Sequence, residues 1–555
     1  MSRRDNAPPW GTAFGSVVSF LIYRLLAAAN ADPFGQYLFG GVALACALHA
    51  LLGLISAFRW GRTVKAMQEP TGLYGPVDVP GFDDLETMGL SFSNQDGNGI
   101  PVGGDGKRIA YYRGPAPVSY RAATNAGKTE SGSAPICFAL GAHRNIVATA
   151  KGAELAYIVA KYRRDVLKQN VYIVDPWGLM KGSGLSTHNL NPIGHLPRYA
   201  ETGSPELLDK VRGKTLQLLP EPEGASGENR IFRVLARDFL SGSMAAAAVF
   251  EHEDGELCCN LPYLAQVLGG SHEDLLDYLR RMRGCDHLGG SIRRTAERFL
   301  SRLNRSPKFA ESILSEVNAA LALYDAGGPL AAHTEYSDFD PADLKRPDKP
   351  TSVFFVVPTE KTVLYGPHVG LCVDGIVDVC IEANRFEPRV TCVLDEFAAL
   401  GVLSCAQTLL YQARSKGIQL VSFVQDTESF SRYGKEASAF TTQSELVIAW
   451  AIRSTKDAKE YSERSGQRSV VVESVGMPGQ SDGAHSINLS EKGIPIYRPD
   501  DFLHLPDFTA AVFYKQNPPI IMTLASYRMV DPWRTYAQPV PGAPPMPDVP
   551  VLYRA

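Results

Sequence analysis

Residues 122–129 read A-A-T-N-A-G-K-T, a spacing that could bind phosphate. They match the phosphate-loop pattern G-x-x-x-x-G-K-[ST] except at the first glycine, which is Ala122 here. In that pattern the backbone N–H groups around Gly127 face phosphate oxygens, Lys128 reaches the β- and γ-phosphates, and Thr129 ligates Mg²⁺. The alternative is that G-K-T occurs here by chance at the start of an ordinary helix. The expected nucleotide-contacting residues are Thr124, Asn125, Ala126, Gly127, Lys128, Thr129 and Glu130.

Two carboxylates follow an apolar run further along the chain, where residues 389–396 read R-V-T-C-V-L-D-E. Asp395 would hold Mg²⁺ through water, and Glu396 would polarise an attacking water. The alternative is a helix whose first turn favours acids through its dipole. The next apolar run, 418–424, ends at Gln425, whose amide suits positioning of the γ-phosphate or the water. A simple helix cap or loop polar group is the alternative for that glutamine.

Strands alternating with helices must position these groups, which implies parallel pairing with right-handed crossovers. We expect the early strands at 117–124, 145–150 and 170–175, and the late strands at 352–357, 390–394, 418–424 and 446–453. Helices are expected at 127–141 and 151–168. Because the carboxyl ends of parallel strands share one edge of a sheet, the loop, the carboxylates and the amide should meet there. The loop, the carboxylates and the amide together predict nucleotide binding far more specifically than any one of them alone.

The first sixty residues predict a two-helix membrane hairpin. Residues 37–58 are a run of 22 residues without a formal charge, long enough for one span. A second run, 11–29, is interrupted by Arg24, which can snorkel to the interface. The link at 30–36 carries the turn signal Asp32-Pro33. Basic residues flank both runs, so both ends should be cytoplasmic. One span plus an interfacial helix is the alternative.

Composition limits the classes of protein. The chain has 555 residues, 45% apolar and 21% charged, which excludes a mainly disordered protein. Nine scattered cysteines exclude a disulfide scaffold, and the lack of any C-x-x-C pair disfavours metal knuckles. A net charge of -4 excludes a uniformly basic protein that coats nucleic acid.

Changes in composition and hydrophobic pattern along the chain predict six segments. These are a transmembrane hairpin with cytoplasmic flanks at 1–66, a linker at 67–107, a nucleotide-binding domain in two parts at 108–195 and 331–530, an all-helical domain at 196–330, and a proline-rich tail at 531–555. The tail is expected to be extended.

One helical segment is strongly basic. From 280 to 308 there are nine Lys or Arg and only two acids. Such a stripe could neutralise the phosphates of DNA, and it consists of Arg293, Arg294, Arg298, Arg302 and Arg305. The alternative is a solvated helix face whose charges pair with acids elsewhere, such as those at 251–256 or 273–274.

Taken in order, these motifs resemble the type IV secretion coupling proteins, the conjugative ATPases of the TraG/TraD kind. Residues 394–401 read L-D-E-F-A-A-L-G and match the family's D-E-F-x-x-L-G. The family's later residues follow in order as Gly417, Gln425, Tyr433-Gly434 and the S-E-R-S-G of 462–466, and Asn191-Pro192 matches an earlier N-P. The sequence departs from the pattern at Ala122, at Thr149, and at Ala153 within the K-G-A-E of 151–154.

The resemblance implies an α/β fold: a RecA-like P-loop nucleotide-binding domain with an inserted all-α domain, preceded by the two-helix transmembrane hairpin. It implies a homo-hexamer under the inner membrane, multi-pass and with a large cytoplasmic domain, that uses ATP and Mg²⁺. The partners it implies are the components of a type IV secretion channel, with a relaxase–DNA complex, single-stranded DNA or effector proteins as substrates.

Ring ATPases complete each site with an arginine from the neighbouring subunit. Arg414 is the candidate that the resemblance implies, and Arg453 is a second, with a surface salt bridge as the alternative for either. Two other functions stay open: a non-hydrolysing receptor or docking platform, motivated by Ala122 and the altered 151–154 segment, and a membrane DNA translocase unrelated to secretion. The chemically active residues of the loop and of the two later strands favour the hydrolysing enzyme.

Overall fold

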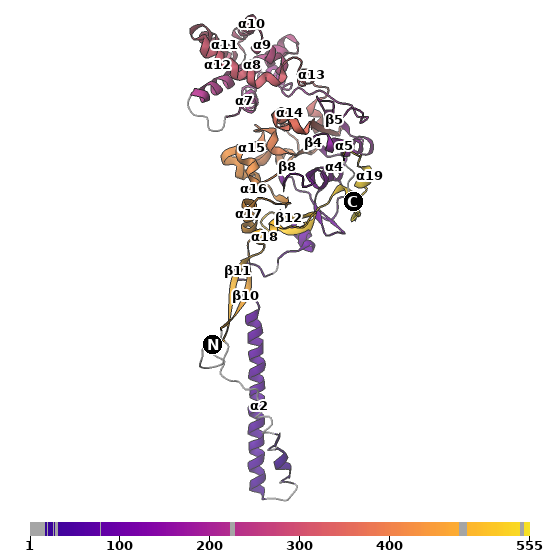
Figure 1. The fold of residues 1–555 in the computed structure, drawn as a ribbon, viewed down its shortest axis with the longest axis vertical. Helices are drawn as coiled ribbons and strands as arrows, with labels where there is room; N and C mark the ends of the chain where they lie inside the picture. Colours follow the sequence, from indigo (N-terminus) through magenta and orange to yellow (C-terminus); the bar gives the residue numbers. More distant parts are fainter. Residues whose placement is uncertain are drawn as a thin grey trace. The chain divides into compact units, whose positions relative to one another are not determined.

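The structure is a computed structural model (Figure 1). The structure describes residues 17–18, 20–25, 27, 32–77, 79–221, 228–476, 486–543 and 549–554. It divides into two compact units. One contains Met1–Val79 and Ser462–Arg498, and the other contains Pro80–Tyr461 and Pro499–Ala555.

The larger unit is built on an 11-stranded sheet with the order β2-β1-β13-β12-β9-β3-β8-β7-β4-β6-β5. From β9 to β5 all neighbouring strands are parallel. These strands are β3 (Val118–Ala122), β4 (Asn145–Lys151), β5 (Asn170–Val174), β6 (Thr351–Val357), β7 (Val390–Leu394), β8 (Ile418–Val424) and β9 (Leu446–Trp450). The predicted parallel strands are therefore confirmed, because apolar, β-branched runs suit strands that are buried on both faces.

Antiparallel strands extend the sheet beyond β9. They are β12 (Thr509–Tyr514), β13 (Ile520–Thr523), β1 (Ile100–Gly104) and β2 (Ile109–Tyr112). The predicted linker at 67–107 was wrong at its C-terminal end, where β1 forms. Its proline and glycines read as turn residues, but a register shift between Pro101 and Gly103 accommodates them in the sheet.

Helices cover both faces of the sheet and create two cores. Within β6, Val353 and Phe355 belong to one core while Phe354 and Val356 belong to the other, since side chains alternate along a strand. The covering helices include α4 (Ala134–Ala139), α5 (Glu154–Lys161), α14 (Thr362–Glu382), α15 (Ala406–Tyr411) and α16 (Ala439–Thr442). Helices α17 (Thr455–Ser465) and α18 (Pro499–Leu503) lie later in the chain.

A helical segment separates β5 from β6. It contains α6 (Pro197–Glu201), α7 (Glu206–Leu218), α8 (Glu228–Asp254), α9 (Leu261–Gly269), α10 (His272–Arg283), α11 (His287–Arg305), α12 (Pro307–Leu321) and α13 (Ala331–Thr334). Figure 1 shows α8 to α12 gathered together, with α7 between them and α14. Its buried side chains are continuous with one core of the sheet, so its boundaries as a separate domain stay a prediction.

The tail is only partly extended. A short helix, α19 (Trp533–Tyr536), interrupts it, and β15 (Tyr553–Arg554) pairs in parallel with β14 (Val530–Asp531). The expectation of a wholly extended tail was therefore wrong, because Trp533 is buried in a core and anchors the turn.

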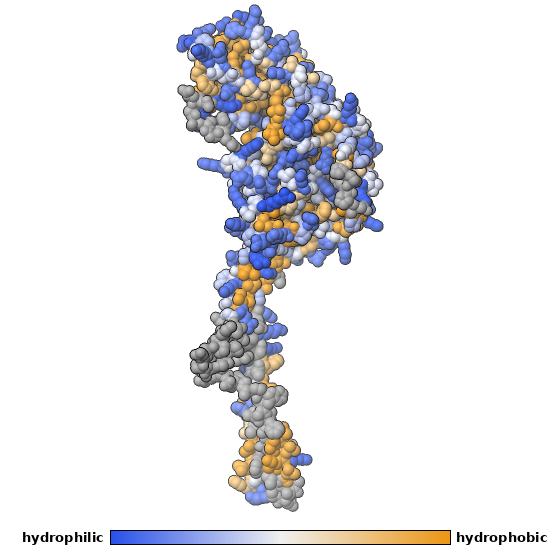
Figure 2. Space-filling view, in the orientation of Figure 1, coloured by the Kyte–Doolittle hydropathy of each residue, from blue (hydrophilic) through white to orange (hydrophobic). Residues whose placement is uncertain are grey.

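The smaller unit contains the long helix α2 (Pro33–Gln68) and the hairpin of β10 (Gln467–Gly476) and β11 (Ser486–Pro495). Residues Pro33–Ser56 have a mean hydropathy of 2.2 and are 7% buried, and Figure 2 shows hydrophobic side chains on this part of the surface. The predicted apolar run at 37–58 is thus helical, and by length and composition it could cross a membrane. The helix begins within the predicted link, because a proline fits the first helical turn.

The predicted first span, 11–29, lies partly outside the described residues. The two-helix hairpin therefore stays a prediction. A second helix of sufficient length and apolarity, Thr359–Glu382, is 72% buried. That degree of burial marks α14 and the turn before it as core of the larger unit.

Gly417, just before β8, offers a test of the fold. Its φ is +66°, and an added Cβ would lie 1.8 Å from the carbonyl oxygen of Phe386. We predict that Gly417→Ala destabilises the protein by about 3 kcal/mol, because backbone strain and a backbone clash add together.

Gly203 supplies the matched control, since its φ is +62° but no atom lies within 4 Å of an added Cβ. Gly203→Ala should cost only about 1 kcal/mol of strain. Thermal unfolding of the purified chain measures both, and equal losses for the two variants would contradict the close approach at Gly417.

Candidate functional site

The loop after β3 forms a curl of backbone N–H groups. Asn125 and Gly127 both have left-handed backbones, with φ of +62° and +70°. An added Cβ at Gly127 would meet only the Cβ of Glu130, at 3.9 Å, so conformation rather than crowding favours glycine there. Such curls form concave anion sites at helix starts. Ala122 is the buried last residue of β3 and precedes the curl.

Two contacts hold this loop. The ammonium of Lys128 donates a hydrogen bond to the carbonyl of Ala122 at 3.1 Å. The indole N–H of Trp450 donates to the carbonyl of Ala126 at 2.7 Å. Because Trp450 ends β9 and is the register partner of Ala122, the pairing of β3 with β9 fixes the loop.

Asp395 lies buried at the end of β7. Its backbone N–H donates to the carbonyl of Thr149 at 3.3 Å, and the Thr149 hydroxyl donates to the carbonyl of Asp395 at 3.1 Å. Burial raises the pKa of the Asp395 carboxyl to about 6, and the charge of Lys128 opposes that rise. The structure therefore brings the carboxylate close to the loop lysine but leaves its buried charge only partly compensated.

Glu396 and Gln425 meet beside Asp395, as the sequence predicted. The Gln425 amide donates to Oε1 of Glu396 at 2.9 Å, and Nζ of Lys151 lies 3.9 Å from Oε2. Glu396 has a left-handed backbone, with φ of +51°, and its side chain is 17% exposed. Backbone strain of this kind is tolerated where the surrounding structure fixes it, often at functional sites. The partly exposed carboxylate is thus oriented and open to water.

Two further acidic groups, Glu130 and Glu154, lie near the start of the helical segment Thr129–Ser133 that follows the loop. Burial raises the pKa of Glu154, while a hydrogen bond with Thr129 lowers it. Glu130 accepts a hydrogen bond from Ser526 at 2.8 Å and lies 3.6 Å from the guanidinium of Arg528. The Thr129 hydroxyl and the Asp395 carboxylate are oxygen donors of the kind that Mg²⁺ prefers. No cluster of three or more His, Cys, Asp or Glu suited to a metal occurs among the described residues.

The two predicted arginines lie at different edges of the sheet. Arg414 is exposed in the turn Ala413–Lys416, at the amino end of β8, whereas Gln425 follows its carboxyl end. Arg453 is exposed and follows the carboxyl end of β9. Within one chain, therefore, the structure does not bring Arg414 to the carboxylates, and Arg453 lies at the same edge as they do.

Part of the basic stripe on α11 is neutralised locally. Arg293 pairs with Asp286, and Arg298 lies 3.0 Å from Asp238. Arg294 donates to a backbone carbonyl at 2.7 Å.

Two of the acids at 251–256 pair within the basic segment 280–308, as the alternative expected, though not with the stripe arginines. Asp254 pairs with Arg281, and Glu253 lies 2.8 Å from His287. Arg302 and Arg305 have no ion pair within the part of the chain that the structure describes. The stripe therefore keeps some positive charges that could bind an anionic partner. Their number is smaller than the sequence suggested.

Sequence reasoning gave no chemical role to three residues that the structure brings to the site. Lys151 is the last residue of β4 and Glu154 begins α5 just after it, beside β7, so their place at the end of an apolar strand was the available signal. Trp450 had no local signal, because its contact with the loop depends on which strand pairs with β3.

Comparisons with known proteins identify relatives of the chain. The family described as type IV secretory system conjugative DNA transfer matches residues 91–536. A conjugal transfer protein TraG of Escherichia coli is 26% identical over 432 residues, covering 74% of this chain, and the chain spans only 65% of the length of that protein.

Solved structures of the coupling protein TrwB have the same fold. The bacterial conjugative coupling protein TrwBdeltaN70, in an unbound form, has a TM-score of 0.57 and 16% identity, covering 82% of this chain and 96% of that chain. A structure of the plasmid coupling protein TrwB in complex with ADP and Mg²⁺ has a TM-score of 0.55 and 16% identity, with the same coverage. The likeness confirms the predicted α/β, RecA-like fold class.

The partly compensated charge of Asp395 leads to a prediction about the stability of the protein. The folded state binds a proton at this carboxyl more readily than the unfolded chain, so stability falls as pH rises from about 4 to about 6, and the full cost of the ionised Asp395 is present above pH 6. We predict that Asp395→Asn stabilises the nucleotide-free protein at pH 7.5, by about 1 to 3 kcal/mol, and that the gain shrinks at pH 5.

Thermal unfolding at the two pH values measures this gain. Glu396→Gln is the control, since the carboxylate of Glu396 is partly exposed and its loss should change stability far less. A destabilised Asp395→Asn protein at pH 7.5 would contradict the charge assignment.

Proposed function

Since the chain belongs to the type IV secretory system conjugative DNA transfer family, we propose that it is an inner-membrane ATPase that couples substrate recruitment to a type IV secretion channel. One observation carries the proposal: a phosphate-loop curl, a buried carboxylate and an oriented glutamate lie together at one edge of a parallel sheet. The proposed substrates are relaxase-bound single-stranded DNA, effector proteins, or both.

The residues present fit a nucleotide with Mg²⁺. The loop N–H groups and Lys128 would hold the β- and γ-phosphates, and Thr129 and Asp395 would hold the ion. Two protein oxygens suit Mg²⁺, which keeps several waters and binds substrate phosphates. The buried charge of Asp395 is of the sign that a cation would stabilise. When bound, Mg²⁺ polarises the phosphoryl group and neutralises developing charge. The TrwB complex with ADP and Mg²⁺ supports this fit.

Glu396 is the group we assign to water activation. Its carboxylate would accept a proton from the attacking water, and the hydrogen bond from Gln425 at 2.9 Å would fix the orientation of that carboxylate. Gln425 retains its amide oxygen to position the water or the γ-phosphate. Nζ of Lys151, 3.9 Å from Oε2, places a positive charge beside the same carboxylate.

The membrane anchor and the ring are further parts of the proposal. The exposed apolar stretch Pro33–Ser56 supports one span, and the run at 11–29 would supply the second. In a homo-hexamer, Arg414 or Arg453 of a neighbouring subunit would complete each site. Arginines of the stripe on α11 would contact DNA phosphates, with affinity that falls as salt rises.

ATP hydrolysis by the full chain in detergent, with and without single-stranded DNA, tests the proposal. We expect Lys128→Ala to lose nucleotide binding, because it removes the phosphate-binding cation. Glu396→Gln should keep nucleotide binding and lose about 10²- to 10⁴-fold in kcat, because only water activation is removed.

No hydrolysis by the unaltered, assembled protein with DNA would overturn the enzyme and favour a docking platform. Hydrolysis that ignores DNA would favour protein substrates. Hydrolysis that needs DNA, in a protein that does not associate with secretion-channel components, would favour a translocase unrelated to secretion.

A further inference from the structure

A buried ionic cluster joins α7 of the helical segment to α14. The side chain of Lys214 on α7 is 1% exposed, and that of Asp374 on α14 is 0% exposed. Lys214 pairs with Asp374 and lies 2.7 Å from Asp378, which also accepts from Lys210 at 2.6 Å. Two carboxylates hold the pKa of Lys214 above its usual range, against the effect of burial. Burying such charges is costly unless every group is well paired.

Asp374 uses its second oxygen for a different task. Oδ1 accepts a hydrogen bond from the backbone N–H of Cys405 at 2.7 Å and from the Ser404 hydroxyl at 2.6 Å. Leu403, the preceding residue, donates its backbone N–H to the hydroxyl of Tyr433 at 3.2 Å. The loop that follows the turn Phe397–Leu400 (η7) is therefore tied to α14 by a charge-assisted hydrogen bond.

Helix α14 also touches the backbone of that turn. An added Cβ at Gly366 would lie 2.0 Å from the carbonyl oxygen of Ala399, and one at Gly370 would lie 2.2 Å from that of Leu400. Only glycines allow this approach of a helix to another backbone. The turn begins at the residue after Glu396, so α14 supports the end of this turn and the loop that follows it.

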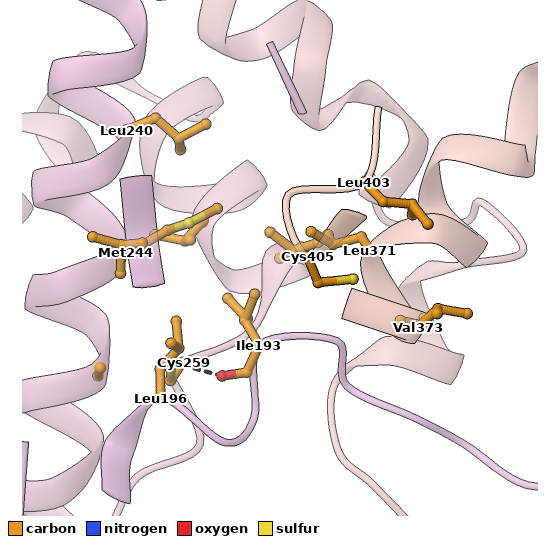
Figure 3. Close-up of a cluster of buried hydrophobic side chains, with 14 of the residues drawn as sticks. Ile193, Leu196, Leu240, Met244, Cys259, Leu371, Val373, Leu403 and Cys405 are labelled. Carbon is orange, nitrogen blue, oxygen red and sulfur yellow. Dashed lines mark hydrogen bonds between the residues drawn. The ribbon is translucent and has the colours of Figure 1, made fainter. Parts of the chain in front are cut away.

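The surroundings of the cluster are apolar. Figure 3 shows Leu371 and Val373 of α14 and Leu403 and Cys405 of the loop among buried side chains that continue to Met244 of α8. In such surroundings a single charged contact is worth more than at the surface, and a lost partner costs more.

We infer that Asp374 is a positioning residue for the proposed hydrolysis: it fixes the segment 396–405 and with it the carboxylate of Glu396. Among the described residues, Asp374 has hydrogen bonds and ion pairs with Lys214, Ser404 and Cys405 and none with the nucleotide loop. Lys214 holds the Asp374 side chain in the rotamer that reaches the loop. The inference rests on the proposed function, since it assigns a role in that function to a residue away from the nucleotide.

Asp374→Ala tests the inference by removing both hydrogen bonds to the loop. We expect kcat for ATP to fall at least about tenfold, while the Kd for a fluorescent ADP analogue stays within twofold. The loop amides of 396–405 should exchange with solvent at least about fivefold faster, and those of 124–134 should not change. Ser404→Ala, which removes one bond and no buried charge, should lower kcat about two- to fivefold, so the test survives if Asp374→Ala does not fold.

The charge-matched variant Lys214→Met/Asp374→Asn provides the rescue. Its Asn oxygen can still accept from Cys405 and Ser404, and Asp378 keeps Lys210 as its partner. We expect kcat to return to within about threefold of the unaltered protein. Arg233→Met/Glu316→Gln, which removes a 3.0 Å ion pair between α8 and α12, is the control and should leave kcat within twofold.

Any of three outcomes would overturn the inference. The first is an unchanged kcat per folded site in both Asp374→Ala and Ser404→Ala. The others are a nucleotide affinity that falls in step with kcat, and no rescue in a folded double variant. If the unaltered protein hydrolyses no ATP, the proposed function fails, but hydrogen exchange at 396–405 still decides whether Asp374 fixes this segment.

Discussion

The parallel register of β3, β8, β7 and β4 is the constraint on which the rest of the site depends. It pairs Arg121 with Val424, and Thr149 with Leu394. The loop, Asp395 and Gln425 therefore leave the sheet at one edge. Because side chains alternate along a strand, a slip of one residue in β7 would turn its buried side chains to the wrong core and displace both carboxylates. Trp450, at the end of β9, transmits the same register to the nucleotide loop.

Two buried aspartates in the larger unit differ in how far neighbouring groups compensate their charge. Asp374 has a buried cation on one oxygen and two donors on the other, so its charge is matched within the fold. Asp395 has only partial compensation from Lys128, and burial raises the pKa of its carboxyl. Protein charges that lack a full internal partner are costly, and such charges cluster at functional sites. The contrast supports a binding role for Asp395 and a positioning role for Asp374.

Much of the fold and half of the site could be predicted from the sequence. G-K-T after an apolar run and L-D-E at the end of another are local patterns, and parallel strands bring such patterns together. Other features had no local pattern. Strand β1 was hidden by its proline and glycines, and Lys214 and Asp374 are 160 residues apart in the chain. Arg414, predicted to complete the site of a neighbouring subunit, precedes β8 as the chain order requires and lies at the opposite edge from Gln425.

A structure of the assembled protein with Mg²⁺ and a non-hydrolysable ATP analogue would test the proposed nucleotide site most directly. We expect β- and γ-phosphate oxygens on the N–H groups of residues 126–129 and Mg²⁺ about 2.1 Å from the Thr129 hydroxyl. We also expect an ordered water between the γ-phosphate and Glu396. A nucleotide bound elsewhere, or a Glu396 carboxylate turned away from the γ-phosphate in every subunit, would show that this edge of the sheet is not the hydrolytic site.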